Sequence, residues 1–114
     1  MANADVVYLK HIIDAILRIN EYLQEINEEE FNRNYLVQDG VIRQLQIIGE
    51  AVKQISPKTR KNNSNVPWKD MAGMRDKLIH DYFGIDIGQV WITAKNDIPF
   101  LQKQIEIVLD KLQS

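Results

Sequence analysis

The chain has 114 residues, enough for one hydrophobic core, and we expect a single domain over residues 1–114. Its hydrophobic fraction of 45% and charged fraction of 26% are typical of a soluble globular protein. The sequence has no cysteine and two histidines, which excludes disulfides and thiolate metal sites and argues against a histidine-rich metal cage. We therefore expect neither a metal site nor another cofactor.

The start of the chain and its apolar segments predict the compartment. Residues 1–5 lack the basic and then apolar order of a signal peptide. No stretch approaches the roughly 18–20 uninterrupted apolar residues that a membrane span needs. These features predict a cytoplasmic protein that does not enter a membrane.

The net charge of −2 is unevenly distributed. Residues 1–42 carry eight acids and three bases, a balance of −5, whereas residues 43–77 carry eight bases and three acids, a balance of +5. The middle of the chain would therefore attract a polyanion that its first part repels. This distribution permits RNA binding, but an uneven surface charge without function explains it equally well.

The first half of the sequence predicts two long amphipathic helices. Apolar residues recur at alternating steps of three and four in each, as on one face of a helix. The first helix is predicted over residues 5–27. The second is predicted to begin near Asn34 and to end at Ser56, because Pro57 disfavours helix in the residue before it. The two apolar stripes are Leu9, Ile12, Ile16, Ile19, Leu23 and Ile26, and Val41, Leu45, Ile48, Val52 and Ile55.

The segment that follows predicts a loop and two short helical pieces. Residues 58–65 are polar and rich in turn-forming residues, which is typical of a loop. Residues 66–68 open a short helical segment, in which Pro67 suits the first helical position. A further short helix is predicted from Ala72 to about Tyr82.

The last segment predicts one interrupted helix. Asp86 is a suitable N-cap, and Pro99 should kink the helix or split it in two.

No segment alternates with a period of two, so no strand is predicted. We predict an all-α fold, an antiparallel bundle of four to five helices, whose wide apolar stripes favour a homodimer.

One segment, residues 71–83, combines residues that carry chemistry. On a helix, about 100° per residue places Arg75 in the middle of the face formed by Met71, Leu78 and Tyr82. A guanidinium there must be paired, or directed into a cavity or an interface, because an unpaired buried charge is costly.

His80 lies four residues after Asp76, a spacing at which helical side chains meet. The carboxylate can orient the imidazole, which can act as acid or base near neutral pH. Together with the cation, this set suits RNA cleavage by the 2′-hydroxyl, which needs a base, an acid and positive charge but no metal. A purely structural explanation is at least as good from geometry alone: Arg75 in a salt bridge, for instance to Glu50, His80 as a capping residue and Tyr82 in the core.

The sequence from Arg75 to Tyr82 resembles the Arg-x4-His-x-Tyr motif of HepT-like toxins, members of the HEPN superfamily (higher-eukaryote and prokaryote nucleotide-binding proteins). The resemblance extends over nearly the whole chain, in order and at similar spacing. The similar segments are Gln38-Asp39-Gly40-Val41-Ile42-Arg43, Ile47-Ile48-Gly49-Glu50-Ala51, Pro67-Trp68, Ala72-Gly73-Met74-Arg75, and Phe83-Gly84-Ile85-Asp86 with Val90-Trp91.

The resemblance implies a helical HEPN-like homodimer that brings two Arg-His motifs into one cleft and cleaves RNA without a metal. It implies that Arg75 and His80 are catalytic and that Asp76 supports them. It also implies a partner, the minimal nucleotidyltransferase MntA, which acts as antitoxin and can transfer AMP to the motif tyrosine, here Tyr82. An AMP group on the face of the arginine would add charge and bulk and block the site.

Three further residues are weaker candidates for contacts to RNA: Lys77, Arg60 and Lys61. Trp68 and Trp91 are more often core residues than stacking platforms in helices of this kind. Two other functions stay open. In one, the chain is a non-catalytic nucleotide-binding or partner-binding subunit of a nucleotidyltransferase complex. In the other, it is a structural helical bundle without further function.

Overall fold

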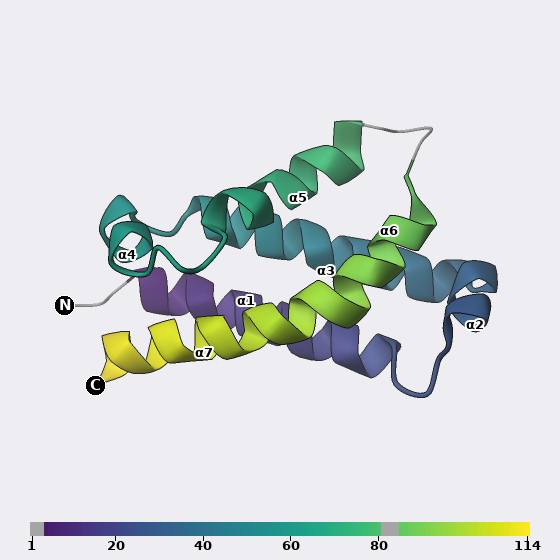
Figure 1. Ribbon diagram of the computed structural model, residues 1–114, viewed down its shortest axis with the longest axis horizontal. Helices are drawn as coiled ribbons and strands as arrows, with labels where there is room; N and C mark the ends of the chain where they lie inside the picture. The colour runs from purple at the N-terminus through teal and green to yellow at the C-terminus, as the bar shows by residue number, and fades with distance from the viewer. Residues whose placement is uncertain (1–3, 81–84) are drawn as a thin grey trace.

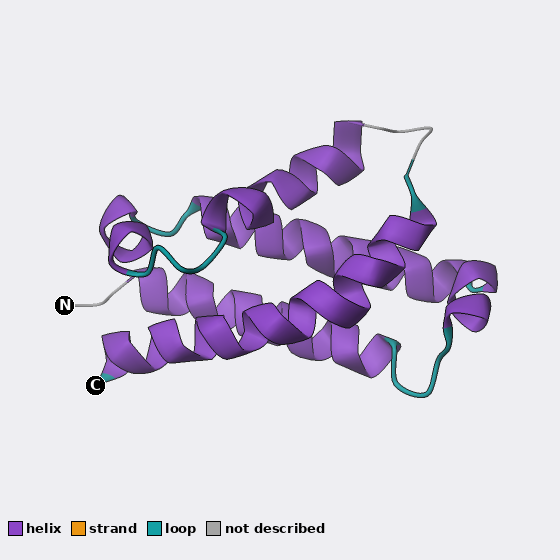
Figure 2. Cartoon of the chain, in the orientation of Figure 1, coloured by secondary structure: helices purple, strands orange, loops and turns teal. Residues whose placement is uncertain are grey.

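The computed structural model describes the backbone of residues 4–80 and 85–114 and the side chains of residues 4–74 and 85–114. Within these ranges it contains seven α-helices, one π-helical turn and no strand, which confirms the all-α prediction (Figure 2). The elements are α1 (Ala4–Tyr22), α2 (Glu28–Arg33), α3 (Tyr35–Lys53), α4 (Pro57–Asn62), α5 (Trp68–His80), α6 (Ile87–Ile92), the π turn η1 (Thr93–Asp97) and α7 (Ile98–Gln113).

The four long helices α1, α3, α5 and α7 form an antiparallel bundle (Figure 1). Helix α1 packs against both α3 and α7, and α3 packs against α5. The short helix α4 lies at the end of the bundle that holds both termini, and α2 lies at the opposite end (Figure 1). The expected four to five helices therefore correspond to the long ones, and the short helices at the ends come in addition.

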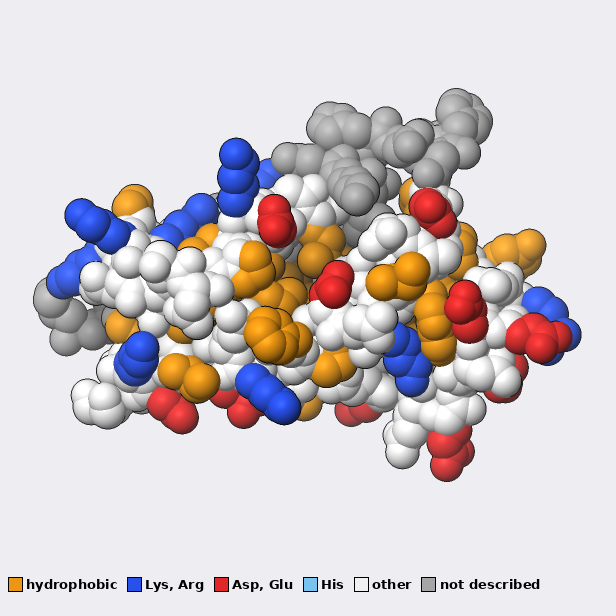
Figure 3. All heavy atoms as spheres, viewed as in Figure 1, with side chains coloured by type: hydrophobic (Ala, Val, Ile, Leu, Met, Phe, Trp, Pro, Cys, Tyr) orange, Lys and Arg blue, Asp and Glu red, His pale blue; other side chains and the backbone are white. Residues whose placement is uncertain are grey.

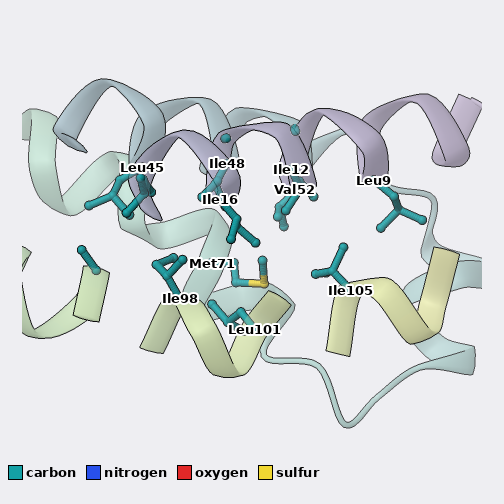
Figure 4. Close-up of a cluster of buried hydrophobic side chains, with 14 of the residues drawn as sticks. Leu9, Ile12, Ile16, Leu45, Ile48, Val52, Met71, Ile98, Leu101 and Ile105 are labelled. Atoms are coloured by element: carbon teal, nitrogen blue, oxygen red, sulfur yellow. The ribbon is translucent and has the colours of Figure 1, made fainter. Parts of the chain in front are cut away.

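The core is mainly aliphatic, with Phe31 and Trp68 as its aromatic residues, and lies between the four long helices (Figure 4). It confirms the predicted stripes, because all of their residues are buried except Ile26, which is half-buried. Met71 from α5 and Ile98, Leu101 and Ile105 from α7 close the core on the other side (Figure 4). Burying one such side chain contributes about 1.5–3 kcal/mol, so these contacts hold the four helices together.

The first helix is shorter than predicted. It ends at Tyr22, five residues before the expected boundary, and Glu25 follows in a turn with a φ of 60°. Asn27 then starts α2 with a capping box, in which its side chain accepts from the backbone N–H of Glu30 at 2.8 Å and its own N–H donates to the Glu30 carboxylate. The apolar spacing continues through Leu23 to Ile26, so the sequence pattern did not indicate the end of the helix at Tyr22.

The predicted start of the second helix is correct, and its predicted end is three residues too late. Asn34 caps α3 by accepting a hydrogen bond from the backbone N–H of Val37 at 3.1 Å. At the other end α3 stops at Lys53, because Ser56 serves as the N-cap of α4 instead of ending α3.

Residues 58–65 were predicted to be a loop, and this prediction was wrong for residues 58–62. Pro57–Asn62 forms α4, with Pro57 in its first turn and the Ser56 hydroxyl accepting from the backbone N–H of Thr59. A Ser-Pro pair is a good helix start, but the polar residues that follow it favoured a loop in the prediction. The two pieces expected around 66–68 and from Ala72 form one continuous helix, α5, and its predicted end near Tyr82 lies outside the described residues.

The C-terminal segment is split, as predicted from Pro99. Asp86 caps α6 by accepting from the backbone N–H of Gln89 at 3.1 Å, which confirms the predicted cap. The π turn η1 follows, and α7 begins immediately after it. Proline has no N–H and its ring crowds the carbonyl four residues earlier, which accounts for the irregular turn at this place. No helix in the described part of the chain is both long enough and apolar enough to cross a lipid bilayer.

Candidate functional site

Helix α5 carries the predicted catalytic residues. Its backbone is helical to His80, so Arg75 and His80 are five residues, about 7.5 Å, apart along one helix axis. The side chains of Arg75, Asp76, Lys77 and His80 lie outside the described residues, and so does the whole of Tyr82. Their assignment as site residues therefore stays a prediction.

The described first half of α5 fixes how this helix lies. Met71 is 1% exposed and packs in the core, which confirms that the predicted apolar face of α5 is turned inward at this point. A Cβ atom added at Gly73 would meet nothing within 4 Å, so the backbone there borders open space. Helix α5 thus has one face on the bundle and another that is accessible.

Two hollows lie beside the accessible face of α5 (Figure 3). The first, of about 480 Å³, is lined by apolar side chains that include Met74 and Phe100 and by the carboxylates Asp70 and Asp97. The second, of about 410 Å³, shares Met74 and both carboxylates and adds Lys69. The first half of α5 therefore borders a mixed apolar and charged surface on this side.

Arg60 holds the end of α3, a role that the sequence did not reveal. Its guanidinium donates hydrogen bonds to the carbonyl oxygens of Val52 at 2.6 Å and Ile55 at 3.2 Å. The carbonyl of Val52 lies in the last turn of α3, where it also accepts from the backbone N–H of Ile55 at 3.1 Å, and the carbonyl of Ile55 lies in the connection to α4. Lys61, the next residue, is exposed.

The two tryptophans have structural roles in the described molecule. Trp68 is 6% exposed, and its indole N–H donates to the carbonyl of Asn63 at 3.0 Å. Trp91 is half-buried, packs against Phe31 with ring centroids 5.3 Å apart, and lies under the ammonium of Lys95. The expectation that they belong to the core is confirmed for Trp68 and fits Trp91.

A cluster of hydrogen bonds around the buried Asp5, at the end of the bundle near the termini, was also missed. Asp5 accepts hydrogen bonds from the backbone N–H and hydroxyl of Ser56 and from the hydroxyl of Thr59. Burial alone would raise the pKa of Asp5, but these hydrogen bonds and the charge of Arg60 outweigh it, so the pKa lies below its ordinary value. The cluster joins α1 to α4. An aspartate in the first turn and a Ser-x-x-Thr sequence were its only signals.

A further hollow, of about 600 Å³, lies between α1 and α3. It is lined by Tyr8, His11, Ile47 and Glu50, among others. The rings of Tyr8 and His11 meet edge to face, with centroids 6.0 Å apart. Among the side chains that the structure describes, no three His, Cys, Asp or Glu residues are grouped closely enough to hold a metal ion.

Comparison with known proteins gives a consistent result. The family model "Ribonuclease HepT-like" matches residues 12–108. A "Probable ribonuclease HepT" from Thermococcus cleftensis is 46% identical over 99 residues, which cover 87% of this chain and 90% of that protein. A "Putative RNase" from Caldanaerobacter subterraneus subsp. tengcongensis is 42% identical over 104 residues, which cover 91% of this chain and 93% of that protein.

One relative is considerably longer. A "Gamma-glutamylcyclotransferase and putative RNase" from Methanocaldococcus jannaschii is 42% identical over 106 residues, 93% of this chain, and the chain spans 48% of that protein's length. No solved structure matches the chain. The matched residues 12–108 take in all of α2 to α6 and most of α1 and α7. From this match and these identities, the chain belongs to the ribonuclease HepT-like family.

Proposed function

We propose that the chain is a metal-independent endoribonuclease that acts as the toxin of a toxin–antitoxin pair. The observation that carries the proposal is the Arg-x4-His-x-Tyr motif, whose Arg75 and His80 belong to α5, in a chain whose relatives are named as ribonucleases. A continuous helix from Trp68 to His80 supports it, because it holds Arg75 and His80 at a fixed spacing.

In the proposed reaction the 2′-oxygen of a ribose attacks the adjacent phosphorus. A bond forms between this oxygen and phosphorus while the bond from phosphorus to the 5′-oxygen breaks. A base takes the proton of the 2′-hydroxyl, and an acid gives a proton to the leaving 5′-oxygen. We assign these transfers to His80, with Asp76 as its supporting residue, and the stabilisation of the phosphorane charge to Arg75.

A homodimer would supply two imidazoles for the two proton transfers. Each chain has one histidine in the motif, and a positioned proton transfer contributes about 10²–10⁴-fold to the rate. Large apolar side chains that are exposed in the single chain, Leu36 at 86% and Phe100 at 64%, support an association. We propose that two α5 helices meet in one RNA-binding cleft.

Regulation in this proposal comes from a nucleotidyltransferase partner of the MntA type. The partner would bind the dimer and transfer AMP to Tyr82. The added phosphate and nucleoside would repel and exclude the RNA from the site of Arg75. Localisation in the cytoplasm follows as part of the same proposal, since RNA and ATP are both available there.

RNA cleavage in excess EDTA, with matched variants, tests the enzyme. We expect the wild-type protein to cleave labelled RNA, and Arg75→Ala and His80→Ala to lose about 10²-fold or more of the activity. The controls are His11→Ala, which changes the other histidine of the chain, and Arg33→Ala, which changes an arginine in a surface ion pair with Glu29.

Two outcomes would contradict the proposal. Equal background cleavage by all five proteins would remove the enzymatic function and favour a non-catalytic partner-binding subunit. Activity that disappears with EDTA and returns with a divalent cation would remove the metal-independent mechanism while leaving a ribonuclease.

A further inference from the structure

A third hollow in the neighbourhood of α5, of about 430 Å³, lies where α4 and α5 meet. Three cationic side chains, Arg60, Lys61 and Lys69, line it with Ser64, and Asp70 is the single carboxylate of its lining. Figure 3 shows Lys and Arg side chains gathered over α4 and the first turns of α5. The hollow is therefore a local site of positive charge on a protein whose net charge is −2.

Hydrogen bonds hold the wall of this hollow in place. The Trp68 indole donates to the carbonyl of Asn63, and the Asn63 amide donates to the carbonyl of Thr59 at 2.9 Å. From α7, the amide of Gln104 donates to the carbonyl of Asn65 at 3.0 Å. The connection between α4 and α5 is thus tied to the bundle, and a ligand would find the site formed in advance.

The cations in the hollow differ in their freedom. Arg60 is fixed by its bonds to the carbonyls of Val52 and Ile55, so its charge stays at one place in the wall. Lys61 and Lys69 are exposed, and in residues 4–74 and 85–114 no side chain pairs with either ammonium group. Two exposed lysines thus line the hollow together with an arginine that its own hydrogen bonds hold in place.

We propose that this hollow binds the sugar–phosphate backbone of the RNA on which the chain acts. Lysine ammonium and serine hydroxyl groups are common donors to phosphate oxygens, and Lys61, Lys69 and Ser64 present them around the fixed charge of Arg60. The indole of Trp68 is buried and cannot stack on a base, so the site contacts the backbone and is indifferent to sequence.

The position of Lys69 connects this site to the catalytic one. Lys69 lies in the first turn of α5, six residues and about 9 Å of helix rise before Arg75. A strand held at Lys61 and Lys69 would extend along α5 toward the second half of the helix. The inference rests on the proposed ribonuclease function and adds a second point of substrate attachment to it.

The salt dependence of RNA binding tests the inference without requiring cleavage. The probe is a fluorescent single-stranded oligonucleotide with 2′-O-methyl groups, which lacks the attacking hydroxyl. Each phosphate contact to a single strand contributes about 0.7 to the slope of log K against log salt. We expect the pair Lys61→Ala with Lys69→Ala to weaken binding and to reduce this slope by about 1.4, twice the value for one contact.

The matched control is the pair Lys10→Ala with Lys103→Ala, which removes the same charge from exposed positions on α1 and α7. We expect the control to keep the wild-type slope. Unchanged slopes in both pairs, or an equal reduction in both, would overturn the inference, because the hollow would then contribute no contact of its own.

Cleavage of unmodified RNA separates this inference from the function on which it rests. A wild-type protein that cleaves RNA, with the Lys61 and Lys69 pair unchanged in KM, would leave the nuclease intact and remove the binding site. A reduced binding slope in the variant, with no cleavage by the wild type, would keep the binding site and remove the nuclease. We expect a raised KM and an unchanged kcat.

Discussion

The carboxylate of Asp5 accepts a 2.6 Å hydrogen bond from the hydroxyl of Thr59, a residue 54 positions further along the chain. The same carboxylate accepts from the hydroxyl of Ser56, again at 2.6 Å, and from its backbone N–H at 2.9 Å. Asp5 is 6% exposed, so these contacts are largely shielded from water. They attach the first turn of α1 to the start of α4.

Asp5→Asn should lower the free energy of unfolding by about 1–3 kcal/mol at neutral pH, because charged hydrogen bonds to buried donors are lost. Urea denaturation at constant pH measures this value. Asp14→Asn, an exposed position on the same helix, is the control and should change it by less than about 0.5 kcal/mol. A change of similar size in both variants would contradict a special role for Asp5.

The same carboxylate predicts a pH dependence of stability. The folded-state pKa of Asp5 lies below the unfolded value of about 3.9. Its contribution is therefore complete well above the unfolded value and is lost as the pH falls through the folded pKa. We expect the difference in stability between wild type and Asp5→Asn to shrink below about pH 4. A difference that grows on acidification would show the opposite sign of the shift.

Arg60→Ala should destabilise the protein through α3. The variant leaves the carbonyls of Val52 and Ile55 without their guanidinium donors, which costs about 1–3 kcal/mol. Thermal unfolding followed by circular dichroism measures the loss. Lys58→Ala removes a neighbouring exposed charge and should leave the midpoint nearly unchanged. If both variants unfold at the wild-type temperature, the two hydrogen bonds do not contribute to stability.

Gly73→Ala should stabilise α5. Glycine inside a helix costs roughly 0.5–1 kcal/mol relative to alanine, and a Cβ atom at Gly73 meets nothing within 4 Å. Gly40→Ala is the comparison, because its Cβ would lie 3.1 Å from the Tyr22 ring, which would have to shift. Urea denaturation should show the larger gain for Gly73→Ala. The reverse order would mean that the space beside Gly73 is occupied.

Modification of Tyr82 gives a prediction about regulation. Incubation with the nucleotidyltransferase partner and ATP should add AMP to the wild-type chain and not to Tyr82→Phe, as intact mass spectrometry measures. Tyr35→Phe is the control, since Tyr35 is 76% exposed and lies outside the motif, at the start of α3. An adduct that persists in Tyr82→Phe would place the modification elsewhere.

The sequence predicted the parts of the fold that depend on local periodicity and capping. The stripes from Leu9 and from Val41 identified the core faces of α1 and α3, and the helix start near Asn34 and the cap at Asp86 were correct. The prediction failed where a continuing stripe crossed a real break, as at Leu23. There the turn around a residue with positive φ interrupts the helix without interrupting the apolar pattern.

The surroundings of the site were less predictable, since they depend on contacts between distant segments. Arg60 was considered as an RNA contact, but its bond to Val52 depends on where α3 ends and α4 begins. The partners of Asp5 are more than 50 positions away, beyond the reach of any spacing rule. The motif on α5 was found because Arg75 and His80 lie close together in sequence.

The π turn at Thr93–Asp97 explains how one helical segment serves two different neighbours. Buried Val90 and Ala94 precede Ile98 in two successive steps of four, whereas the stripe of α7 continues in steps of three and four. The wide turn absorbs the extra rotation, so α6 can contact α2 and α3 while α7 lies on α1. Removing one residue from this turn would rotate every side chain of α7 by about 100° and direct Leu101 and Ile105 into water.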